Sequence, residues 1–360
     1  MGWRIGFFIL TRRFPVFGDA LRTFFCSVIA ASFLASACVQ AQATPVRVLG
    51  SWDFLRQYKE HEQPFWTKQV PALTAGQLTV DLTPFNQLGL TGTEIIRLLR
   101  LGEYDFGSTV LAYGASADVE MEGADLAGLS PDIETAKRVA QAYLPVLDQF
   151  FQKKYGIKVL SLWPYPAQVI YCKTRISGLS DLKGKRIRVG TRPIGEFVEA
   201  LGGVSVNIPF GDAYKALEDS RIDCAITGTL PGNLAKLHRI TQYLYPLPVG
   251  WSMAMQAANL SYWQSLPVTL QETMQQGINR YTEEIWAATA SETQEGINCN
   301  IGRQPCVRGE LGKMVLLPTT DADRRLLQKL LKETVIPRWA TRCGDSCIRA
   351  WEQSVGKVLN

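Results

Sequence analysis

The residue of this chain whose type best suits binding chemistry is Arg188, which lies in the short β-branched run 187–189. A guanidinium presents a planar fork of N–H donors that matches a carboxylate with two parallel hydrogen bonds, and it stays charged when partly buried. An arginine in a strand can instead pair with an acidic neighbour in the same sheet. Which interpretation applies depends on where the strand of Arg188 ends.

The apolar pattern of residues 181–227 predicts where that strand ends. Short β-branched runs, such as 204–208, alternate with helical spacing, such as that of Phe197 and Leu201. This alternation predicts strand, helix, strand, helix, strand, the order of two consecutive crossovers in an α/β sheet. Ligands of such sheets bind in the crevice beyond the carboxyl ends of the strands. We therefore expect Arg188 to point into a ligand-binding crevice.

Several motifs of the chain resemble those of the extracytoplasmic solute-binding proteins of TRAP (tripartite ATP-independent periplasmic) transporters. The most specific is the run Asp-Leu-Lys-Gly-Lys-Arg-Ile-Arg-Val at 181–189. The resemblance covers roughly residues 46–290 and includes Asn86-Gln87-Leu88-Gly89, Gly102-Glu103-Tyr104-Asp105, Glu196-Phe197, Ala200-Leu201-Gly202, Pro209-Phe210, Tyr214-Lys215-Ala216-Leu217, Ile222-Asp223 and Tyr262-Trp263-Gln264-Ser265-Leu266-Pro267. It implies an α/β, two-lobed periplasmic binding protein fold, with a central cleft that closes over the ligand and a long helix spanning both lobes.

The resemblance implies that Arg188 anchors a carboxylate of the ligand. A second ligand-facing arginine of some members aligns with Gln168, and a common asparagine aligns with Thr227. Neither replacement is charged, and Thr227 offers one hydroxyl in place of an amide. We therefore expect a monocarboxylate with an apolar or ring-shaped body, rather than the family's dicarboxylates. Thr191 is a further candidate contact, and Arg192 could supply a second charge if its loop turned inward.

Aromatic residues at predicted strand ends and loops are the other candidate lining of the cleft. A small-molecule site needs apolar walls with a few convergent polar groups. Each of these rings could instead belong to the core, since aromatic residues supply large buried areas. The candidates are Trp52, Tyr113, Trp163, Tyr165, Phe210 and Trp251, of which Phe210 lies in the matched Pro209-Phe210 motif.

The two lobes are expected to be discontinuous in sequence. Strand and helix patterns alternate on both sides of Pro164, and apolar residues at intervals of three and four predict one long helix over 267–298. We expect hinges near Pro164, Thr227 and Trp251, where the chain would cross between lobes. The assignment is 44–165 plus 253–293 for the first lobe, and 166–252 plus 294–360, with disulfide-linked C-terminal helices, for the second.

The first 43 residues have the pattern of a secretory signal peptide. Four arginines precede the apolar run 24–37, and Ala41-Gln42-Ala43 supplies small residues before a cleavage site. The run is shorter than the roughly 20 residues that a membrane span needs. We predict cleavage after Ala43 and a periplasmic protein. The alternative is a lipoprotein anchored at Cys38.

The cysteines beyond the leader are even in number, which in an exported chain indicates disulfides. We predict that the last four, Cys299, Cys306, Cys343 and Cys347, form two bridges, with connectivity left open. A zinc site is the alternative, although their spacing is loose for one. Cys172 and Cys224 fall in predicted strands and are either buried free thiols or a further pair.

The composition excludes several other classes of function. The chain has a formal net charge of +5, and four of its arginines lie in the leader. This charge does not indicate a nucleic-acid partner. The two histidines, His61 and His238, have no metal-ligand or triad spacing, and the Gly250–Ala254 run lacks the second glycine of a hydrolase elbow. We predict no cofactor, no metal and no enzymatic activity.

We therefore interpret the chain as the solute-binding protein of a TRAP transporter. Such a protein captures an organic acid and delivers it to membrane permease subunits. The alternatives are a periplasmic ligand sensor for a signalling receptor and, less favoured, a secreted hydrolase that uses the same cleft.

Overall fold

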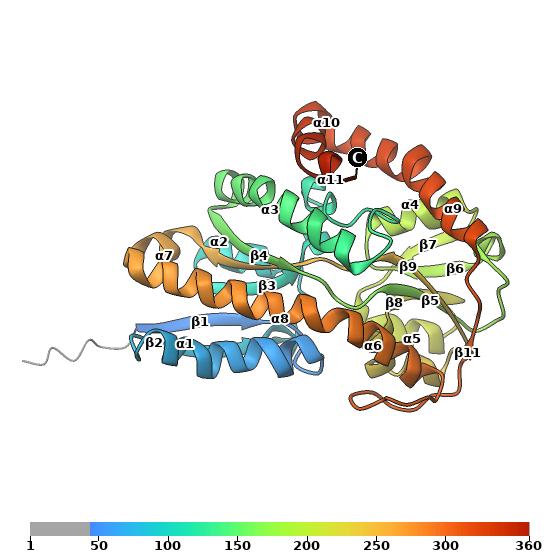
Figure 1. Ribbon diagram of the computed structural model, residues 1–360, viewed down its shortest axis with the longest axis horizontal. Helices are drawn as coiled ribbons and strands as arrows, with labels where there is room; N and C mark the ends of the chain where they lie inside the picture. Colours follow the sequence, from blue (N-terminus) through green and yellow to red (C-terminus); the bar gives the residue numbers. More distant parts are fainter. Residues whose placement is uncertain (1–43, 360) are drawn as a thin grey trace, which may run out of the picture. The chain divides into compact units, whose positions relative to one another are not determined.

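The computed structural model describes residues 44–359, which fold into two lobes, each built on its own β-sheet (Figure 1). The predicted leader and the alternative lipoprotein cysteine, Cys38, lie outside the described residues. Helices accompany both sheets, so the predicted α/β, two-lobed class is confirmed.

The first lobe contains a five-stranded sheet in the order β2-β1-β3-β10-β4. β1 pairs in parallel with β2 and β3, whereas β10 is antiparallel to both of its neighbours. Because β10 follows β5 to β9 of the other sheet in the chain, the first lobe is discontinuous in sequence. The strands are Thr44–Gly50 (β1), Leu78–Pro84 (β2), Phe106–Val110 (β3), Ile157–Trp163 (β4) and Ala254–Asn259 (β10).

The second lobe contains a six-stranded sheet in the order β11-β9-β5-β8-β6-β7. β6, β7 and β8 are parallel, as the sequence pattern predicts, and β5 runs antiparallel to β8 and β9. The carboxyl ends of β6 and β8 therefore lie beside the start of β5. The strands are Gln168–Cys172 (β5), Arg186–Val189 (β6), Val204–Asn207 (β7), Cys224–Gly228 (β8), Tyr243–Gly250 (β9) and Val315–Leu316 (β11).

Helices make up most of the remaining chain. The α-helices are Val70–Leu73 (α1), Ile95–Leu101 (α2), Ile133–Tyr155 (α3), Arg192–Ala200 (α4), Ala213–Glu218 (α5), Thr229–Leu234 (α6), Leu260–Ser265 (α7), Val268–Asn300 (α8), Asp321–Leu330 (α9), Ile336–Trp351 (α10) and Lys357–Leu359 (α11). The chain also contains short 3-10 helices, including Val119–Glu122 (η5) and Phe210–Asp212 (η7), and π-helices, including Gln57–Glu62 (η1), Leu331–Val335 (η9) and Glu352–Gly356 (η10).

The start of α4 is fixed by local sequence. The Thr191 hydroxyl accepts a hydrogen bond from the Ile194 N–H at 3.4 Å, which satisfies one of the free donors of the first turn. Pro193 occupies that turn, where its missing N–H costs nothing. The helix buries Ile194, Phe197 and other residues against the sheet. The carboxyl end of β6 and the first turn of α4 are thereby held side by side.

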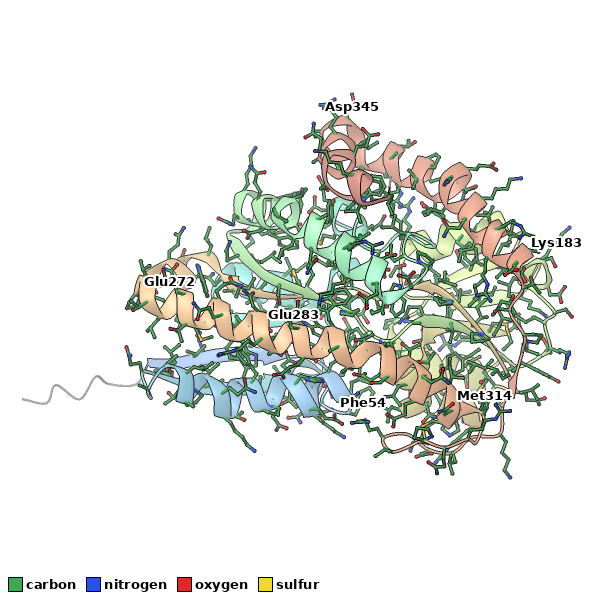
Figure 2. The ribbon with its side chains drawn as sticks, in the orientation of Figure 1. Phe54, Lys183, Glu272, Glu283, Met314 and Asp345 are labelled. Carbon is green, nitrogen blue, oxygen red and sulfur yellow. A yellow bond between two sulfur atoms is a disulfide. The ribbon has the colours of Figure 1, made fainter. Side chains whose placement is uncertain are left out.

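The predicted long helix is confirmed as α8, which has 33 residues and is therefore about 50 Å long. Figure 1 shows it running past both sheets, and it packs on β4 of the first lobe and on α6 of the second. Its buried stripe includes Met274, Ile278 and Ile285. The opposite face carries exposed carboxylates such as Glu272 and Glu283 (Figure 2). This amphipathic pattern explains why one helix can serve both lobes.

The chain crosses between the sheets at two short segments besides α8. One joins β4 to β5 through Tyr165, and the other joins β9 to β10 through Trp251. The two crossovers touch, because the Tyr165 N–H donates to the Trp251 carbonyl at 2.9 Å. The expected hinge at Thr227 is wrong, since β8 continues into α6 within the second lobe.

The C-terminal helices contact both lobes. α9 and η9 pack on α4 of the second lobe, whereas α10, η10 and α11 pack on α3 of the first, and α10 also packs on η5. Two indole N–H groups fix this docking, from Trp339 to the Val119 carbonyl at 3.0 Å and from Trp351 to the Gly123 carbonyl at 2.7 Å. The sequence analysis placed these helices on the second lobe, whereas their contacts extend to the first.

All six cysteines of the described residues are disulfide-bonded. The pairs are Cys172–Cys224, Cys299–Cys306 and Cys343–Cys347. The four C-terminal cysteines thus form two local bridges rather than a zinc site. The open alternative for Cys172 and Cys224 is decided by β5 and β8, which place these two residues directly opposite each other.

Candidate functional site

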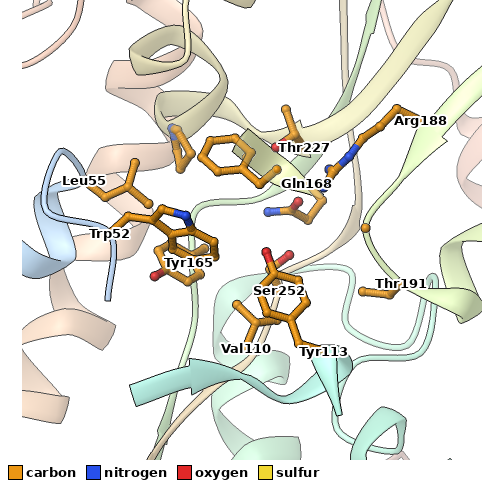
Figure 3. A pocket seen from close by; sticks show the side chains of 14 residues that line it. Trp52, Leu55, Val110, Tyr113, Tyr165, Gln168, Arg188, Thr191, Thr227 and Ser252 are labelled. Atoms are coloured by element: carbon orange, nitrogen blue, oxygen red, sulfur yellow. The ribbon is translucent and has the colours of Figure 1, made fainter. Parts of the chain in front are cut away.

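Arg188 is a buried cation that has no carboxylate partner within the described range 44–359. Its side chain enters a cavity between the two lobes, and the residue is only 3% exposed (Figure 3). Its Nε donates to the Ile208 carbonyl at 2.8 Å, and its Nη1 donates to the Ile226 carbonyl at 2.9 Å. These bonds orient the guanidinium and leave Nη2 with no hydrogen bond to residues 44–359. The remaining N–H groups are available to a ligand.

The electrostatics of this cavity favour an anion. Burial lowers the pKa of Arg188, and the neighbouring Tyr113 hydroxyl acts in the opposite direction. Burial also raises the pKa of Tyr113 to about 12, against the effect of Arg188, so the phenol stays neutral and supplies no counter-charge. None of the residues that line the cavity is acidic. A buried charge without a partner is costly, and an anionic ligand would relieve that cost.

Polar groups from neighbouring strands converge on the same cavity. Gln168 starts β5 and Thr227 lies near the end of β8, where Gln168 pairs with Gly228. Thr191 and Ser252 also line the cavity, the latter from the β9–β10 crossover with an unusual φ of 46°. Figure 3 shows Arg188, Gln168 and Thr227 together on one side of the cavity and Ser252 opposite. The site therefore combines one cation with several neutral hydrogen-bonding groups.

Aromatic rings form the remaining wall. Trp52 follows β1 and lies at its centre, with ring centroids 5.9 Å from Tyr113, 5.9 Å from Tyr165 and 5.7 Å from Phe210, all edge to face. Phe210 belongs to the second lobe, where it begins η7 after β7. Its contact with Trp52 therefore joins the two lobes across the site. The rings give the cavity an apolar wall beside its polar groups.

The enclosed space is small. The cavity has a volume of about 40 Å³, a few times the roughly 10–15 Å³ that one water requires. Because its walls come from both lobes, the cavity lies in the cleft between them. The arrangement can hold a small anion, and it contains no set of groups suited to activating a nucleophile.

A family model described as bacterial extracellular solute-binding protein, family 7, matches residues 56–308. The chain belongs to this family. The resemblance to TRAP solute-binding proteins that the central motif indicated is therefore confirmed. The matched range begins one residue before η1 and ends after α8, so it includes every residue named above at the cavity except Trp52.

Relatives of this solute-binding protein share its architecture. An uncharacterized protein of Haemophilus influenzae is 25% identical over 229 residues, covering 62% of this chain and 68% of the relative. A Bordetella pertussis extracytoplasmic solute receptor binding pyroglutamic acid has a TM-score of 0.75 at 19% identity, covering 86% of this chain and 99% of the other. A TRAP periplasmic solute binding protein from Desulfovibrio salexigens, with bound orotic acid, has a TM-score of 0.76 at 19% identity, covering 87% and 99%. At these identities the structures establish the shared fold.

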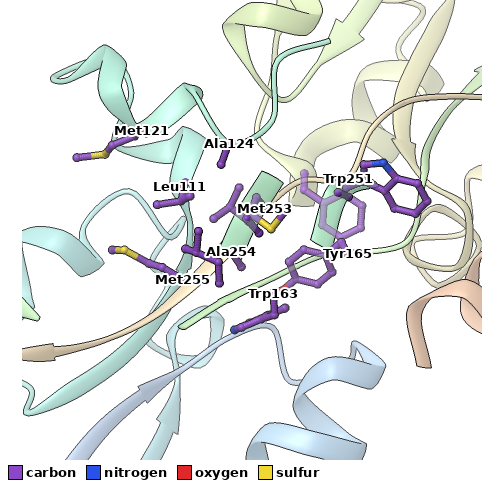
Figure 4. Close-up of a cluster of buried hydrophobic side chains, with 14 of the residues drawn as sticks. Leu111, Met121, Ala124, Trp163, Tyr165, Trp251, Met253, Ala254 and Met255 are labelled. Atoms are coloured by element: carbon purple, nitrogen blue, oxygen red, sulfur yellow. The ribbon is translucent and has the colours of Figure 1, made fainter. Parts of the chain in front are cut away.

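Two predicted lining residues of this solute-binding protein lie elsewhere. Trp163 and Trp251 belong to a buried cluster around the crossovers (Figure 4). The Trp251 indole donates to the Ser130 carbonyl at 2.9 Å, and Trp163 packs on Tyr165 with centroids 5.1 Å apart. Neither lines the cavity. Trp163 therefore supports the Tyr165 ring, whereas the Trp251 side chain is held in the core by its own hydrogen bond.

Arg192 is also outside the cavity at Arg188. Its side chain is 66% exposed, and its Nε lies 3.5 Å from Glu196, one helical turn along α4. It lines a second, wider groove of about 890 Å³ that adjoins the site and shares Tyr113, Gly190 and Thr191 with it. The suggestion that Arg192 supplies a second anchoring charge has no support from this placement.

Several residues that line the cavity were not predicted from the sequence. Leu55, Val110 and Pro231 are apolar and carry no chemical signature, whereas Gly190 and Ser252 act through backbone geometry. Only Gly190, which directly follows the strand of Arg188, could have been found from its position. Between residues 44 and 359, no group of three or more His, Cys, Asp or Glu is arranged to hold a metal ion. No helix in that range is long and apolar enough to cross a membrane.

Proposed function

We propose that this protein captures a small monocarboxylate in the periplasm and delivers it to the membrane permease subunits of a TRAP transporter. One observation carries the proposal. Arg188 is buried between the lobes, has no carboxylate partner among residues 44–359 and keeps N–H groups free toward the cavity. Similar proteins from Bordetella pertussis and Desulfovibrio salexigens hold pyroglutamic and orotic acid, and one from Shewanella oneidensis holds succinate, which supports an organic acid as the ligand.

The neutral surroundings of Arg188 favour one carboxylate over two. Gln168 and Thr227 carry no charge, and Arg192 faces the outer groove. A second carboxylate would lose its water without gaining a cationic partner, at a cost of several kcal/mol. The small cavity also favours a short or small-ring acid over the larger aromatic acids that the wall of rings could suggest. The chain would reach the periplasm through the leader at 1–43, cleaved after Ala43.

Calorimetric titration with a panel of short monocarboxylates and dicarboxylates tests the proposal. Arg188→Ala should weaken binding of the preferred acid by roughly 2–5 kcal/mol, because the ligand loses a charge-assisted contact in a buried site. Arg188→Lys should also bind poorly, since a point charge cannot reproduce the planar fork. The control is Arg192→Ala, which should stay within about threefold of wild type because that side chain is exposed.

The opposite outcomes would overturn the proposal. Succinate or malate binding more tightly than every monocarboxylate would disprove the single-charge site. A loss of about 1.4 kcal/mol corresponds to a tenfold weaker affinity. If Arg188→Ala binds the acid within about threefold of the wild-type affinity, Arg188 is not part of the site.

A further inference from the structure

Gln168 is the distinctive polar group of the cavity. The residue is 5% exposed, and its Nε2 donates to the Pro166 carbonyl at 2.9 Å. A carbonyl oxygen can only accept, so this bond requires the amide nitrogen to face Pro166. The Oε1 atom is consequently turned the other way. It accepts no hydrogen bond from any residue in the range 44–359, and Figure 3 shows the side chain on the wall of the cavity.

The other side chains on this wall have a different hydrogen-bonding character. Arg188 can only donate, and so can the indole of Trp52. The hydroxyls of Tyr113, Thr227 and Ser252 can donate or accept, and no lining residue carries a carboxylate. The Gln168 Oε1 is therefore the one side-chain atom among the lining residues that can only accept. A ligand made of acceptors alone would leave it unpaired after closure.

We propose that Gln168 selects acids that carry a hydrogen-bond donor, a hydroxyl or N–H group, close to the carboxylate held by Arg188. This inference rests on the proposed function and names the ligand class more narrowly. A buried acceptor that loses its water without gaining a donor weakens ligand binding. A neutral donor on the ligand satisfies the acceptor without burying a further charge. Hydroxy acids and lactam acids have this pattern. Keto acids and simple fatty acids do not.

Three acids of nearly equal size separate the possibilities: lactate offers a donor beside the carboxylate, pyruvate offers only an acceptor there, and propionate offers neither. Titrated into the purified protein, lactate should bind at least roughly tenfold more tightly than either of the others, the size expected for one unsatisfied buried polar group. A lactam acid, pyroglutamate, against cyclopentanecarboxylate repeats the comparison with an N–H donor on a ring.

The matched variant is Gln168→Met, which has similar length and no strong hydrogen-bonding atom. In this variant the affinities within each series should converge to within about threefold, while an unchanged circular-dichroism spectrum and thermal unfolding midpoint show that the protein is folded. Arg192→Ala is the control, since this side chain is exposed and lies outside the cavity, so the variant should keep the preference for lactate over pyruvate.

The results distinguish this inference from the proposed function. If pyruvate binds wild type as tightly as lactate, or if the preference for lactate survives in Gln168→Met, then Gln168 does not select donors, although the protein still binds monocarboxylates. If no acid of either series binds wild type at concentrations up to the millimolar range, the proposed function has failed, and this inference fails with it.

Discussion

Gly190 leaves the space that the Arg188 guanidinium occupies. A Cβ atom at position 190 would lie 3.2 Å from Nη2 and 3.3 Å from Nη1 of Arg188. Nη1 is also tied to the Ile226 carbonyl, so the guanidinium cannot withdraw without losing that hydrogen bond. Position 190 therefore contributes to the binding site by having no side chain, which lets Arg188 take its position.

Gly190→Ala should weaken ligand binding by roughly 1–3 kcal/mol, the usual cost of overpacking a tightly filled site. Gly211→Ala is the matched control, because a Cβ there would meet nothing within 4 Å. Titration of both variants with the best-bound acid gives the comparison. Equal affinities of the two would show that the guanidinium moves aside freely.

Phe210 links the lobes across the cleft. The centroid of its ring lies 5.7 Å from that of Trp52 and 6.2 Å from that of Phe54. Each aromatic pair contributes about 0.5–1.5 kcal/mol beyond area burial, so Phe210→Ala should raise the dissociation rate roughly tenfold or more. Phe54→Ala loses one of these pairs and does not touch the cavity, so its effect should be smaller. Stopped-flow tryptophan fluorescence measures both rates. A larger effect of Phe54→Ala would contradict this assignment.

The three disulfides should differ in their contribution to stability. The bonded cysteines are separated by 52 residues in Cys172–Cys224, by 7 in Cys299–Cys306 and by 4 in Cys343–Cys347. The chain-entropy treatment then gives about 4 kcal/mol for the first bridge and about 2 kcal/mol for each of the others. Double Cys→Ala variants, unfolded in urea, should follow this order. Equal losses would mean that native packing, rather than loop length, sets the contributions.

The Glu122 carboxyl should make stability fall as pH rises. Burial raises its pKa to about 7, despite an ion pair with Arg342 at 2.7 Å, and Glu196 and Arg192 are the other charged groups that act on it. The folded protein therefore holds this proton more tightly than the unfolded chain, in which glutamate titrates near 4.3. The stabilisation is complete below that value and is lost between about pH 4.3 and 7, by an amount on the order of 1–3 kcal/mol.

Thermal or urea unfolding between pH 5 and 8 measures this effect. Glu122→Gln should flatten the decline, because the amide does not titrate. The buried carboxyls of Glu292 and Asp125 act in the same direction, since burial raises their pKa values to about 7 and about 6, so part of the slope should remain. Glu199 lines the same wide groove as Glu122 but is exposed. Glu199→Gln should therefore change the slope of stability against pH much less. An unchanged slope in Glu122→Gln would contradict the assignment.

Local sequence was sufficient for the elements that carry the central site. The alternation of runs around 181–227 predicted β6, α4, β7, α5 and β8 in order, because strand and helix periods are short-range signals. The position of Arg188 at the end of a parallel strand followed from that order. The regular apolar spacing of α8 also identified the helix that both lobes share.

Strand β9 was missed for an equally local reason. β9 contains Pro246 and Pro248, which cannot donate hydrogen bonds and break the alternating pattern of a strand. Its pairing with β5 is correspondingly irregular, with a register shift between Gln168 and Ile170. The sequence pattern therefore did not reveal β9, although the return to the first lobe near Trp251, directly after this strand, was predicted.

The sequence by itself determined the alternation of strands and helices, the placement of Arg188 at a strand end and the pairing potential of the cysteines, because these depend on neighbours within a few residues. Tertiary structure decided which aromatic rings face the ligand, since Trp163 and Tyr165 lie two residues apart and only Tyr165 lines the cavity. It also decided which way the Gln168 amide turns, because the Pro166 carbonyl that orients it is presented by a crossover. These features depend on contacts between both lobes, which no local period encodes.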